Sequence, residues 1–341
     1  DRLTPDDIEA IAAQVFLEML EAGYAGVAEF HYLHHDVGGA AYGNLGELSE
    51  RIVAAAEGVG IGLTLLAVLY QWGGCDSRAL QGGQQRFGNT PEQYLRLHEA
   101  GARAVRASHA DYHIGVAPHS LRAVDADGLR AALGAAGHGP IHMHLAEQVA
   151  EVEEVEAAWG ARPVEWLFDH HEIDARWCMI HATQMNARET EMLAKSGAVA
   201  GLCPITESSL GDGIFNGVEY LGYGGRVGFG SDSNIHIAYF DELRTLEYSQ
   251  RLRDRSRAAL ANATHSTGRV LIEAASVGGA QAAGRQSGAI VAGRWADLVG
   301  ISTDNAWVCN RTGDTALDSL IFGGHGQKCV SEVWSAGRHV V

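Results

Sequence analysis

Cysteine and membrane-length apolar runs are scarce in this chain, and each shortage excludes a class of protein. The 341 residues include only five cysteines, and no two form a Cys-x-x-Cys pair. This pattern indicates free thiols in a reducing compartment rather than a disulfide scaffold. No run approaches the roughly 20 apolar residues of a membrane span, and no charged-then-apolar secretion segment opens the sequence. The sequence therefore predicts a cytoplasmic protein.

Positive charge is also in short supply. Lys and Arg total 25 against 42 Asp and Glu, which gives a formal net charge of −17. A chain this acidic is a poor partner for nucleic acid or for an anionic membrane surface. A small anionic substrate remains compatible, because a binding site can be locally basic. Glycine, by contrast, is abundant at 43 residues, which suits a fold with many tight strand–helix turns.

Short apolar strand patterns alternate with helical patterns along most of the chain. The strand patterns are near-continuously apolar, as in a parallel sheet covered by helices, and cover 25–30, 61–70, 114–118, 141–144, 177–180, 198–202 and 227–230. Helical patterns cover 5–22, 47–59, a segment from Thr90, 125–136, 148–159, 163–170, 186–196, 241–257 and 266–283. Because seven strand–helix units follow an opening helix, the pattern predicts an α/β protein with a TIM-type (β/α)8 barrel that lacks its first strand.

An open, doubly wound sheet is the alternative arrangement, and it would gather a site at one switch point. Polar residues at the ends of five or more strands favour the barrel instead. We expect residues 1–285 to form the barrel domain and residues 286–341 a small β appendage. The appendage is predicted to contain a turn and strand at 288–299 and a strand pair at 330–341.

The stretch from His142 to Glu147 carries the clearest sign of chemistry. It reads as a strand that ends in polar residues just before a helix, so His142 and His144 face the same side and Glu147 lies in the following turn. A neutral imidazole and a nearby carboxylate at this position can hold a metal and move protons beside it. The alternative is a pair of hydrogen-bonded interior histidines followed by a helix-start Glu.

Other strands end in the same kinds of residue, which favours a site over the alternative. These strand-end residues are His181, Asp232, and His119 with Arg122. A divalent metal site needs imidazole and carboxylate ligands from different strands, with one position open for water. His144 and Asp232 are therefore the candidate metal ligands. His181 and Glu147 are the candidates for orienting that water and moving protons.

The motifs that hold these residues form a recognisable set. They are His142-Met143-His144-Leu145-Ala146-Glu147, Ile180-His181-Ala182, Leu202-Cys203-Pro204 with Leu210-Gly211-Asp212-Gly213, Gly230-Ser231-Asp232-Ser233, and a tail from Gly288 to Val299. Together they span most of the chain and resemble the deaminase branch of the amidohydrolase superfamily. The resemblance implies that His144 and Asp232 bind one zinc ion. It also implies that Glu147 shuttles protons and His181 contacts the nucleophilic water, while Asp232 acts as the base.

Three further segments, 29–36, 119–124 and 206–215, are similar to the N-formimino-L-glutamate deiminases of histidine breakdown. That resemblance implies that Tyr32, His119 and Arg122 hold the carboxylates of a small dicarboxylate amidine substrate. The chemistry agrees, because Arg offers a bidentate fork while Tyr and His add single donors. The products would be N-formyl-L-glutamate and ammonia. Glu207 stands where the wider family often has Asn, and its role stays open, a contact with the substrate's nitrogen end being one interpretation.

One departure from the family pattern bears on the cofactor. The family's first strand carries a His-x-His pair that supplies two more zinc ligands, and this sequence begins in the helix after it. We expect a fragment of a longer protein whose N-terminal strand supplies those ligands. Two alternatives to the formiminoglutamate deiminase function stay open. They are a heterocycle (purine-type) deaminase of the same superfamily and a catalytically dead, metal-free homologue. Barrels of this type often form homodimers, although no interface is marked in the sequence.

A run of acidic residues follows the central motif. Its members are Glu151, Glu153, Glu154 and Glu156. Charges spaced in this way are typical of a solvated helix face, and we expect no chemical role for them.

Overall fold

Seven parallel strands form a curved central sheet in the computed structural model, which describes residues 2–233 and 236–341. The strands are β1 (Gly26–His31), β2 (Gly62–Leu69), β3 (His113–Pro118), β4 (Ile141–Leu145), β5 (Trp177–His181), β6 (Val199–Leu202) and β7 (Arg226–Phe229). They lie in sequential order, so β1 and β7 form the two edges of this sheet. The predicted seven strands and the TIM-type arrangement are confirmed.

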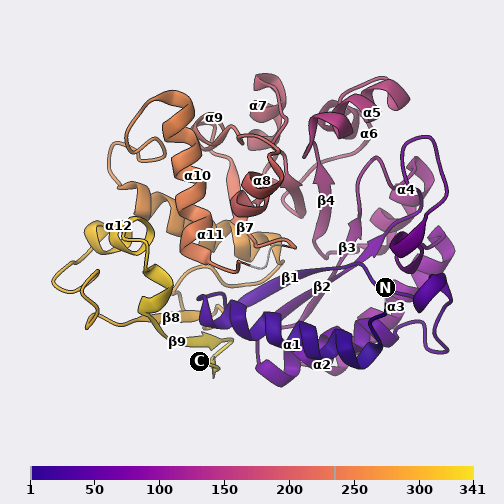
Figure 1. The fold of residues 1–341 in the computed structure, drawn as a ribbon, viewed down its shortest axis with the longest axis horizontal. Coiled ribbons are helices and arrows are strands. Elements are labelled where there is room, and N and C mark those ends of the chain that lie inside the picture. The colour runs from indigo at the N-terminus through magenta and orange to yellow at the C-terminus, as the bar shows by residue number, and fades with distance from the viewer. Residues whose placement is uncertain (1, 234–235) are drawn as a thin grey trace.

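Two helices that run in the same direction, α1 (Pro5–Glu21) and α2 (Glu47–Val59), pack side by side below the sheet in Figure 1. The first begins where the sequence predicts. The Thr4 side chain accepts a hydrogen bond from the Asp7 backbone N–H, the Asp7 carboxylate accepts one from the Thr4 N–H, and Pro5 occupies the first turn. These contacts satisfy N–H groups that have no partner within the helix, which fixes its start.

The other predicted helices are also present. They are α3 (Pro91–Ala107), α4 (Ala126–Ala135), α5 (Val149–Trp159), α6 (Pro163–His170), α7 (Ala187–Ser196), α10 (Tyr239–Asp254) and α11 (Thr267–Ala282). Three helices were not predicted: α8 (Pro204–Leu210), α9 (Gly217–Gly222) and α12 (Asp314–Phe322). The first two have only 7 and 6 residues, too few for a helical period to show in the sequence.

The core lies between the sheet and these helices. Every residue of β2 is buried, as its continuous apolar run predicts, whereas most of β1 is only half-buried because it lies at the sheet edge. Helix α11 packs directly on β7. A Cβ at Gly278 would collide with the backbone of Val227, so the Gly- and Ala-rich sequence of α11 is what permits this close approach.

A second, antiparallel sheet of three strands lies near the C-terminus, in the order β10 (Arg338–His339), β9 (Val330–Ser335), β8 (Leu298–Ile301). The predicted strand pair at 330–341 is confirmed. The turn and strand predicted at 288–299 are both present, with the strand beginning only at Leu298 and continuing to Ile301. Gly288 and Gly293 have φ values of 80° and 90°, which turn the chain before the strand begins. The boundary after residue 285 stays a prediction.

A buried ion-pair network joins the small sheet to the amino ends of the central strands. The Arg285 guanidinium contacts Asp111 at 2.8 Å and Asp297 at 2.7 Å, and Arg338 contacts Asp111 at 2.8 Å. The Arg285 side chain lies against Gly62, where an added Cβ would be 2.7 Å from the guanidinium carbon. Only 4% of the Arg285 side chain and 2% of the Asp111 side chain are exposed. The network therefore connects two sheets through a buried pair, Arg285 and Asp111, and the partly exposed Asp297 and Arg338.

All five cysteines carry free thiols, as the sequence predicts. In the described part of the chain, no helix combines the length and apolar character that crossing a membrane requires.

Candidate active site

The predicted site residues meet at the carboxyl ends of the central strands. Tyr32 follows β1 directly and His119 follows β3 directly. His144 is the next-to-last residue of β4, His181 is the last residue of β5, and Asp232 lies just beyond β7. Because the strands are parallel and sequential, their carboxyl ends all lie at the same end of the sheet. The sequence prediction that several strand ends build one site is thus consistent with the topology.

His144 is buried and oriented by the backbone. Its Nδ1 lies 3.1 Å from the His119 carbonyl oxygen, which places the proton on Nδ1 and leaves a lone pair on Nε2. Nε2 lies 3.4 Å from the Tyr32 hydroxyl. Burial lowers the pKa of His144 to about 3, so the imidazole is neutral at physiological pH. His144 therefore presents an imidazole lone pair at the carboxyl ends of the strands, where the Tyr32 hydroxyl is its neighbour.

His119 and Tyr32 lie next to this imidazole. The His119 ring stacks on the His144 ring, with centroids 4.6 Å apart, and its Nδ1 lies 2.9 Å from the Ser120 hydroxyl. The Tyr32 and His119 rings are 5.6 Å apart. Burial lowers the pKa of His119 and raises the pKa of Tyr32, so a neutral imidazole and a protonated phenol are the forms present near neutrality. Both can donate a hydrogen bond to an anionic ligand.

His181 lies between two carboxylates. Its Nδ1 is 3.2 Å from Glu207 Oε1, and its Nε2 is 3.7 Å from Glu147 Oε1. Burial on its own lowers the pKa of His181, but the hydrogen bond to Glu207 and the charge of Glu147 outweigh it and the net shift is upward. Burial also raises the pKa of Glu147. Both pKa shifts favour the protonated form, which suits groups that exchange protons with a substrate.

The backbone at three of these strand ends adopts a left-handed conformation that non-glycine residues avoid. The φ values are 51° at Ala146, 67° at His181 and 51° at Asp232. Each such residue costs on the order of 1 kcal/mol. Strain of this kind at the ends of β4, β5 and β7 turns the chain sharply, and it is typical of functional sites.

Glu151 corrects one prediction. The sequence places it on a solvated helix face with its acidic neighbours, but it is buried, with 8% of the residue exposed. Its carboxylate accepts hydrogen bonds from the Ala146 N–H at 3.0 Å and the Glu147 N–H at 2.7 Å. Glu151 therefore fixes the strained turn that carries Glu147. The prediction holds for Glu153 and Glu156, which are exposed.

Arg122 is half-buried beside the histidines and the tyrosine. Its positive charge contributes to lowering the pKa of His119, of His144 and of Tyr32, although burial is the largest influence on each. Across residues 2–233 and 236–341, no carboxylate lies within 4.0 Å of its guanidinium. Arg122 is thus a cation near the strand ends that is left without an ion-pair partner in the described chain.

His142 has a different role from His144. Its Nε2 lies 2.7 Å from the Ala282 carbonyl oxygen at the end of α11, and the residue is 3% exposed. The interior, hydrogen-bonded interpretation is therefore right for His142. It faces the same side of β4 as His144 but lies deeper in the barrel.

The side chains near His144 supply only part of what a zinc ion needs. Zinc sites of hydrolases use three protein ligands or more. His144 fits as a metal ligand, because its Nε2 carries the lone pair and its Nδ1–H is held by a carbonyl, as in most metal-binding histidines. In the part of the chain that the structure describes, however, no three His, Cys, Asp or Glu side chains are grouped to hold one metal ion. His144 and Asp232 alone do not complete a zinc site.

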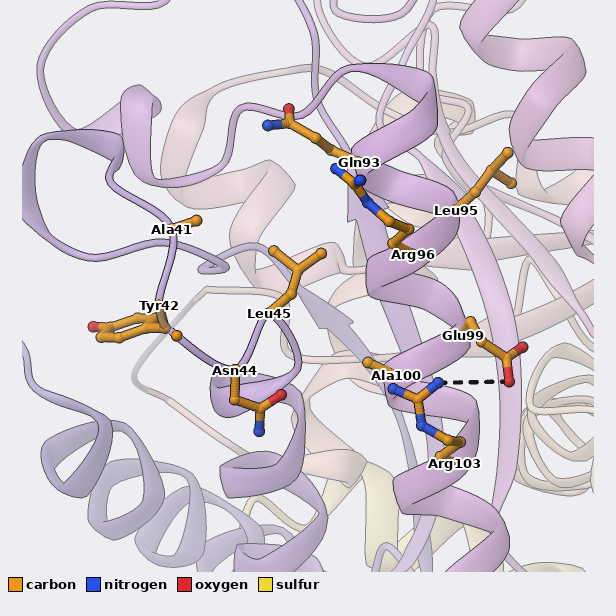
Figure 2. A pocket seen from close by; sticks show the side chains of 11 residues that line it. Ala41, Tyr42, Asn44, Leu45, Gln93, Leu95, Arg96, Glu99, Ala100 and Arg103 are labelled. Atoms are coloured by element: carbon orange, nitrogen blue, oxygen red, sulfur yellow. Dashed lines mark ion pairs between the residues drawn. The ribbon is translucent and has the colours of Figure 1, made fainter.

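A hollow of about 680 Å³ lies elsewhere, between residues 41–45 and α3 (Figure 2). Tyr42, Asn44 and Arg96 are among its lining side chains, and an Arg103–Glu99 ion pair lies on the same helix. None of the predicted site residues lines it. This hollow is therefore separate from the strand-end site.

A (β/α) barrel with histidine and carboxylate side chains at its strand ends defines a class of hydrolase, and sequence comparison agrees. The model of the amidohydrolase family matches residues 2–340, and the chain belongs to this family. The chain is 46% identical over 343 residues to the formimidoylglutamate deiminase of Pseudomonas aeruginosa, a match that covers 100% of this chain and 75% of that protein. It is also 27% identical over 307 residues to a 5-methylthioadenosine/S-adenosylhomocysteine deaminase of Natronomonas pharaonis, covering 89% of this chain and 64% of that protein.

Solved structures show the same fold. An amidohydrolase from Brucella melitensis superimposes with a TM-score of 0.93 at 47% identity, over 99% of this chain and 74% of that one. An adenosine deaminase from Xanthomonas campestris with bound zinc superimposes with a TM-score of 0.82 at 21% identity, over 99% and 70%. The likeness to the second structure concerns the fold alone.

Proposed function

We propose that this protein hydrolyses N-formimino-L-glutamate to N-formyl-L-glutamate and ammonia, a step of histidine breakdown in the cytoplasm. The 46% identity to a formimidoylglutamate deiminase over the whole chain supports this reaction. The structural observation that carries the substrate assignment is Arg122, a half-buried guanidinium without a carboxylate partner in the described residues, close to Tyr32 and His119. A dicarboxylate supplies the missing partner.

Three residues hold the substrate in this proposal. Arg122 pairs with a carboxylate of the glutamate part. Its guanidinium can donate two parallel hydrogen bonds to the two carboxylate oxygens, a geometry that a lysine ammonium group does not offer. The Tyr32 hydroxyl and the neutral His119 ring each add one hydrogen-bond donor. Because all three lie at the strand ends beside His144, the formimino end of the substrate is directed toward His144, His181 and Glu147.

The reaction needs proton transfers in both directions. Water adds to the formimino carbon, and Asp232 accepts the proton that the water loses. His181 orients the attacking oxygen through Nε2. Glu147 delivers a proton to the terminal nitrogen of the tetrahedral intermediate, and the bond from the carbon to that nitrogen breaks, so that ammonia leaves. The hydroxyl group of the intermediate gives its proton back to the Glu147 carboxylate as the formyl carbonyl forms, and Asp232 releases its proton to water. The pKa of Glu147 is raised by burial, a shift in the direction that suits a proton donor.

Zinc is part of the proposal as the cofactor, with His144 and Asp232 as two of its ligands. The neutral His144 lone pair and the oxygen donors of Asp232 have the chemistry that zinc prefers. Since the described residues do not complete the site, the proton transfers above are assigned only to side chains of this chain. Zinc content and zinc-dependent turnover of the full-length gene product are the measurements that check this part.

Ammonia release from N-formimino-L-glutamate tests the proposed function. The full-length gene product is assayed after zinc loading and again after chelation, with adenosine and S-adenosylhomocysteine as ring-containing comparison substrates. We expect turnover of N-formimino-L-glutamate that chelation abolishes. Turnover of a ring substrate alone would establish a heterocycle deaminase instead, and turnover of none by the zinc-loaded protein would point to a catalytically dead homologue.

Replacing Arg122 tests the carboxylate contact. Arg122→Met keeps much of the side-chain volume and removes the charge, so one charge-assisted interaction of about 1.5–3 kcal/mol is lost. We expect KM to rise by about 10- to 100-fold, because each 1.4 kcal/mol is a factor of about ten. Steady-state ammonia release measures it.

Arg130→Met is the matched control, because 66% of the Arg130 side chain is exposed on α4. Its KM should equal that of the unaltered protein. An unchanged KM in Arg122→Met would remove Arg122 from the binding role.

A further inference from the structure

The Glu207 carboxylate contacts the His181 ring. Its Oε1 lies 3.2 Å from His181 Nδ1 and accepts a hydrogen bond from the Cys203 N–H at 2.9 Å. The residue is buried, with 5% exposed. Glu147 lies on the opposite side of the ring, 3.7 Å from Nε2. Glu207 is therefore behind the histidine, and the one interpretation that the sequence suggested, a contact with the substrate's nitrogen end, does not match this position.

Helix α8, which carries Glu207, is held in place at three points. The Glu207 carboxylate binds the Cys203 N–H at the helix start, and the Glu242 carboxylate accepts from the Ile205 N–H at 2.9 Å. The Thr206 hydroxyl donates to the Ser231 carbonyl at 3.0 Å, one residue before Asp232. A carboxylate mounted on so constrained a turn has little freedom to move away from His181. The same turn also ties the end of β6 to the end of β7.

We propose that Glu207 is the positioning residue of His181: it holds Nδ1 as the donor and thereby turns Nε2 toward Glu147 and the reacting carbon. An imidazole without such a partner can flip about χ2 or exchange its proton between the two nitrogens. His181 has 1% of its side chain exposed, so water does not provide a substitute partner. Glu207 acts through His181 and does not touch the substrate.

The inference rests on the proposed function, since the role of His181 in hydrolysis belongs to it. Its kinetic consequence is selective. Loss of the Nδ1 partner lowers the rate of the chemical step, but it leaves Arg122, Tyr32 and His119 free to bind the substrate. The expected signature is therefore a fall in kcat with KM nearly unchanged, which a general loss of packing would not produce.

The test compares Glu207→Ala, Glu207→Gln and Glu242→Gln in the zinc-loaded, full-length protein. We expect Glu207→Ala to lose about 100-fold in kcat, with KM within about threefold, which is typical for removal of a partner that orients an active-site group. Glu207→Gln keeps an oxygen acceptor for both N–H groups, so it should recover about tenfold of that loss. Glu242→Gln perturbs the same helix from the other side and should keep kcat within about twofold.

A nitrogen-15 NMR spectrum of the histidine side chains supplies a readout that needs no substrate, with the His181 signals assigned by their loss in His181→Asn. We expect protonated Nδ1 in the unaltered protein and a tautomer mixture in Glu207→Ala. An unchanged His181 spectrum in Glu207→Ala, or equal kcat losses in Glu207→Ala and Glu242→Gln, would overturn the inference. If the unaltered protein does not turn over N-formimino-L-glutamate, the proposed function fails, and the NMR comparison still decides the role of Glu207.

Discussion

Glu147→Gln is expected to lower kcat by about 10³- to 10⁴-fold, near the upper end of what one general acid–base group contributes. The Gln side chain has the same shape and can still lie beside His181 Nε2, which is 3.7 Å away in the unaltered protein. It cannot deliver a proton to the leaving nitrogen. Because the substrate carboxylates bind elsewhere, KM should stay within a few-fold. Ammonia release at saturating substrate measures the loss.

Glu153→Gln provides the control for this experiment. Glu153 lies on the adjacent helix α5, but it is exposed, so removing its charge should leave kcat and KM unchanged. A loss smaller than tenfold in Glu147→Gln would show that another group protonates the leaving nitrogen. In that case His181, whose pKa is raised by Glu207 and Glu147 against the effect of burial, becomes the first candidate.

Arg285→Met is expected to destabilise the protein by about 3–5 kcal/mol, as for other buried ion pairs that lose one partner. The change leaves the Asp111 and Asp297 carboxylates desolvated and deprived of contacts at 2.8 Å and 2.7 Å. The free energy of unfolding, from urea titration followed by circular dichroism, measures the effect. Arg103→Met is the matched control. Its pair with Glu99 at 3.8 Å is 63% and 59% exposed, so its loss should cost less than about 1 kcal/mol.

The same network predicts how stability depends on pH. Burial alone raises the pKa of Asp111, but hydrogen bonds from Arg338 and Arg285 outweigh it and lower this pKa to about 2. A carboxyl whose pKa is depressed on folding stabilises the protein above its unfolded pKa of about 3.9 and loses that contribution as pH falls toward 2. The unaltered protein should therefore lose stability between about pH 4 and pH 2. Arg285→Met should lose less over this range, and an identical loss in both proteins would exclude Asp111 as the source.

Short sequence patterns predicted correctly those features of the structure that depend on residues close together in the chain. The start of α1 follows from Thr4, Pro5 and Asp7 alone, because a capping box closes within four residues. The seven strands of the sheet follow from apolar runs with helical segments between them. Motif resemblance also named His144, Glu147 and His181, and the structure brings these three together at one edge of the sheet.

The burial of charged side chains could not be predicted from short sequence patterns. Glu151 lies in the same acidic run as the exposed Glu153 and Glu156. Only the tertiary contacts show that its carboxylate accepts hydrogen bonds from Ala146 and Glu147 inside the protein. Glu207 lies in α8, a helix of 7 residues, which is too short for a helical period to be recognised in the sequence. Its partner His181 is 26 residues away, and no local rule connects the two.

The sequence by itself therefore determined the strand–helix alternation, the end of the sheet where the candidate site residues lie and the residue types available there. These depend on hydrophobic period, capping and the chain order of parallel strands, all of which are properties of short segments. The tertiary structure alone decided which carboxylates are desolvated, which nitrogen of His144 carries the lone pair, and that no carboxylate of the described residues pairs with Arg122. Those properties depend on burial and on contacts between distant segments, and both arise only when the sheet curves and its helices pack.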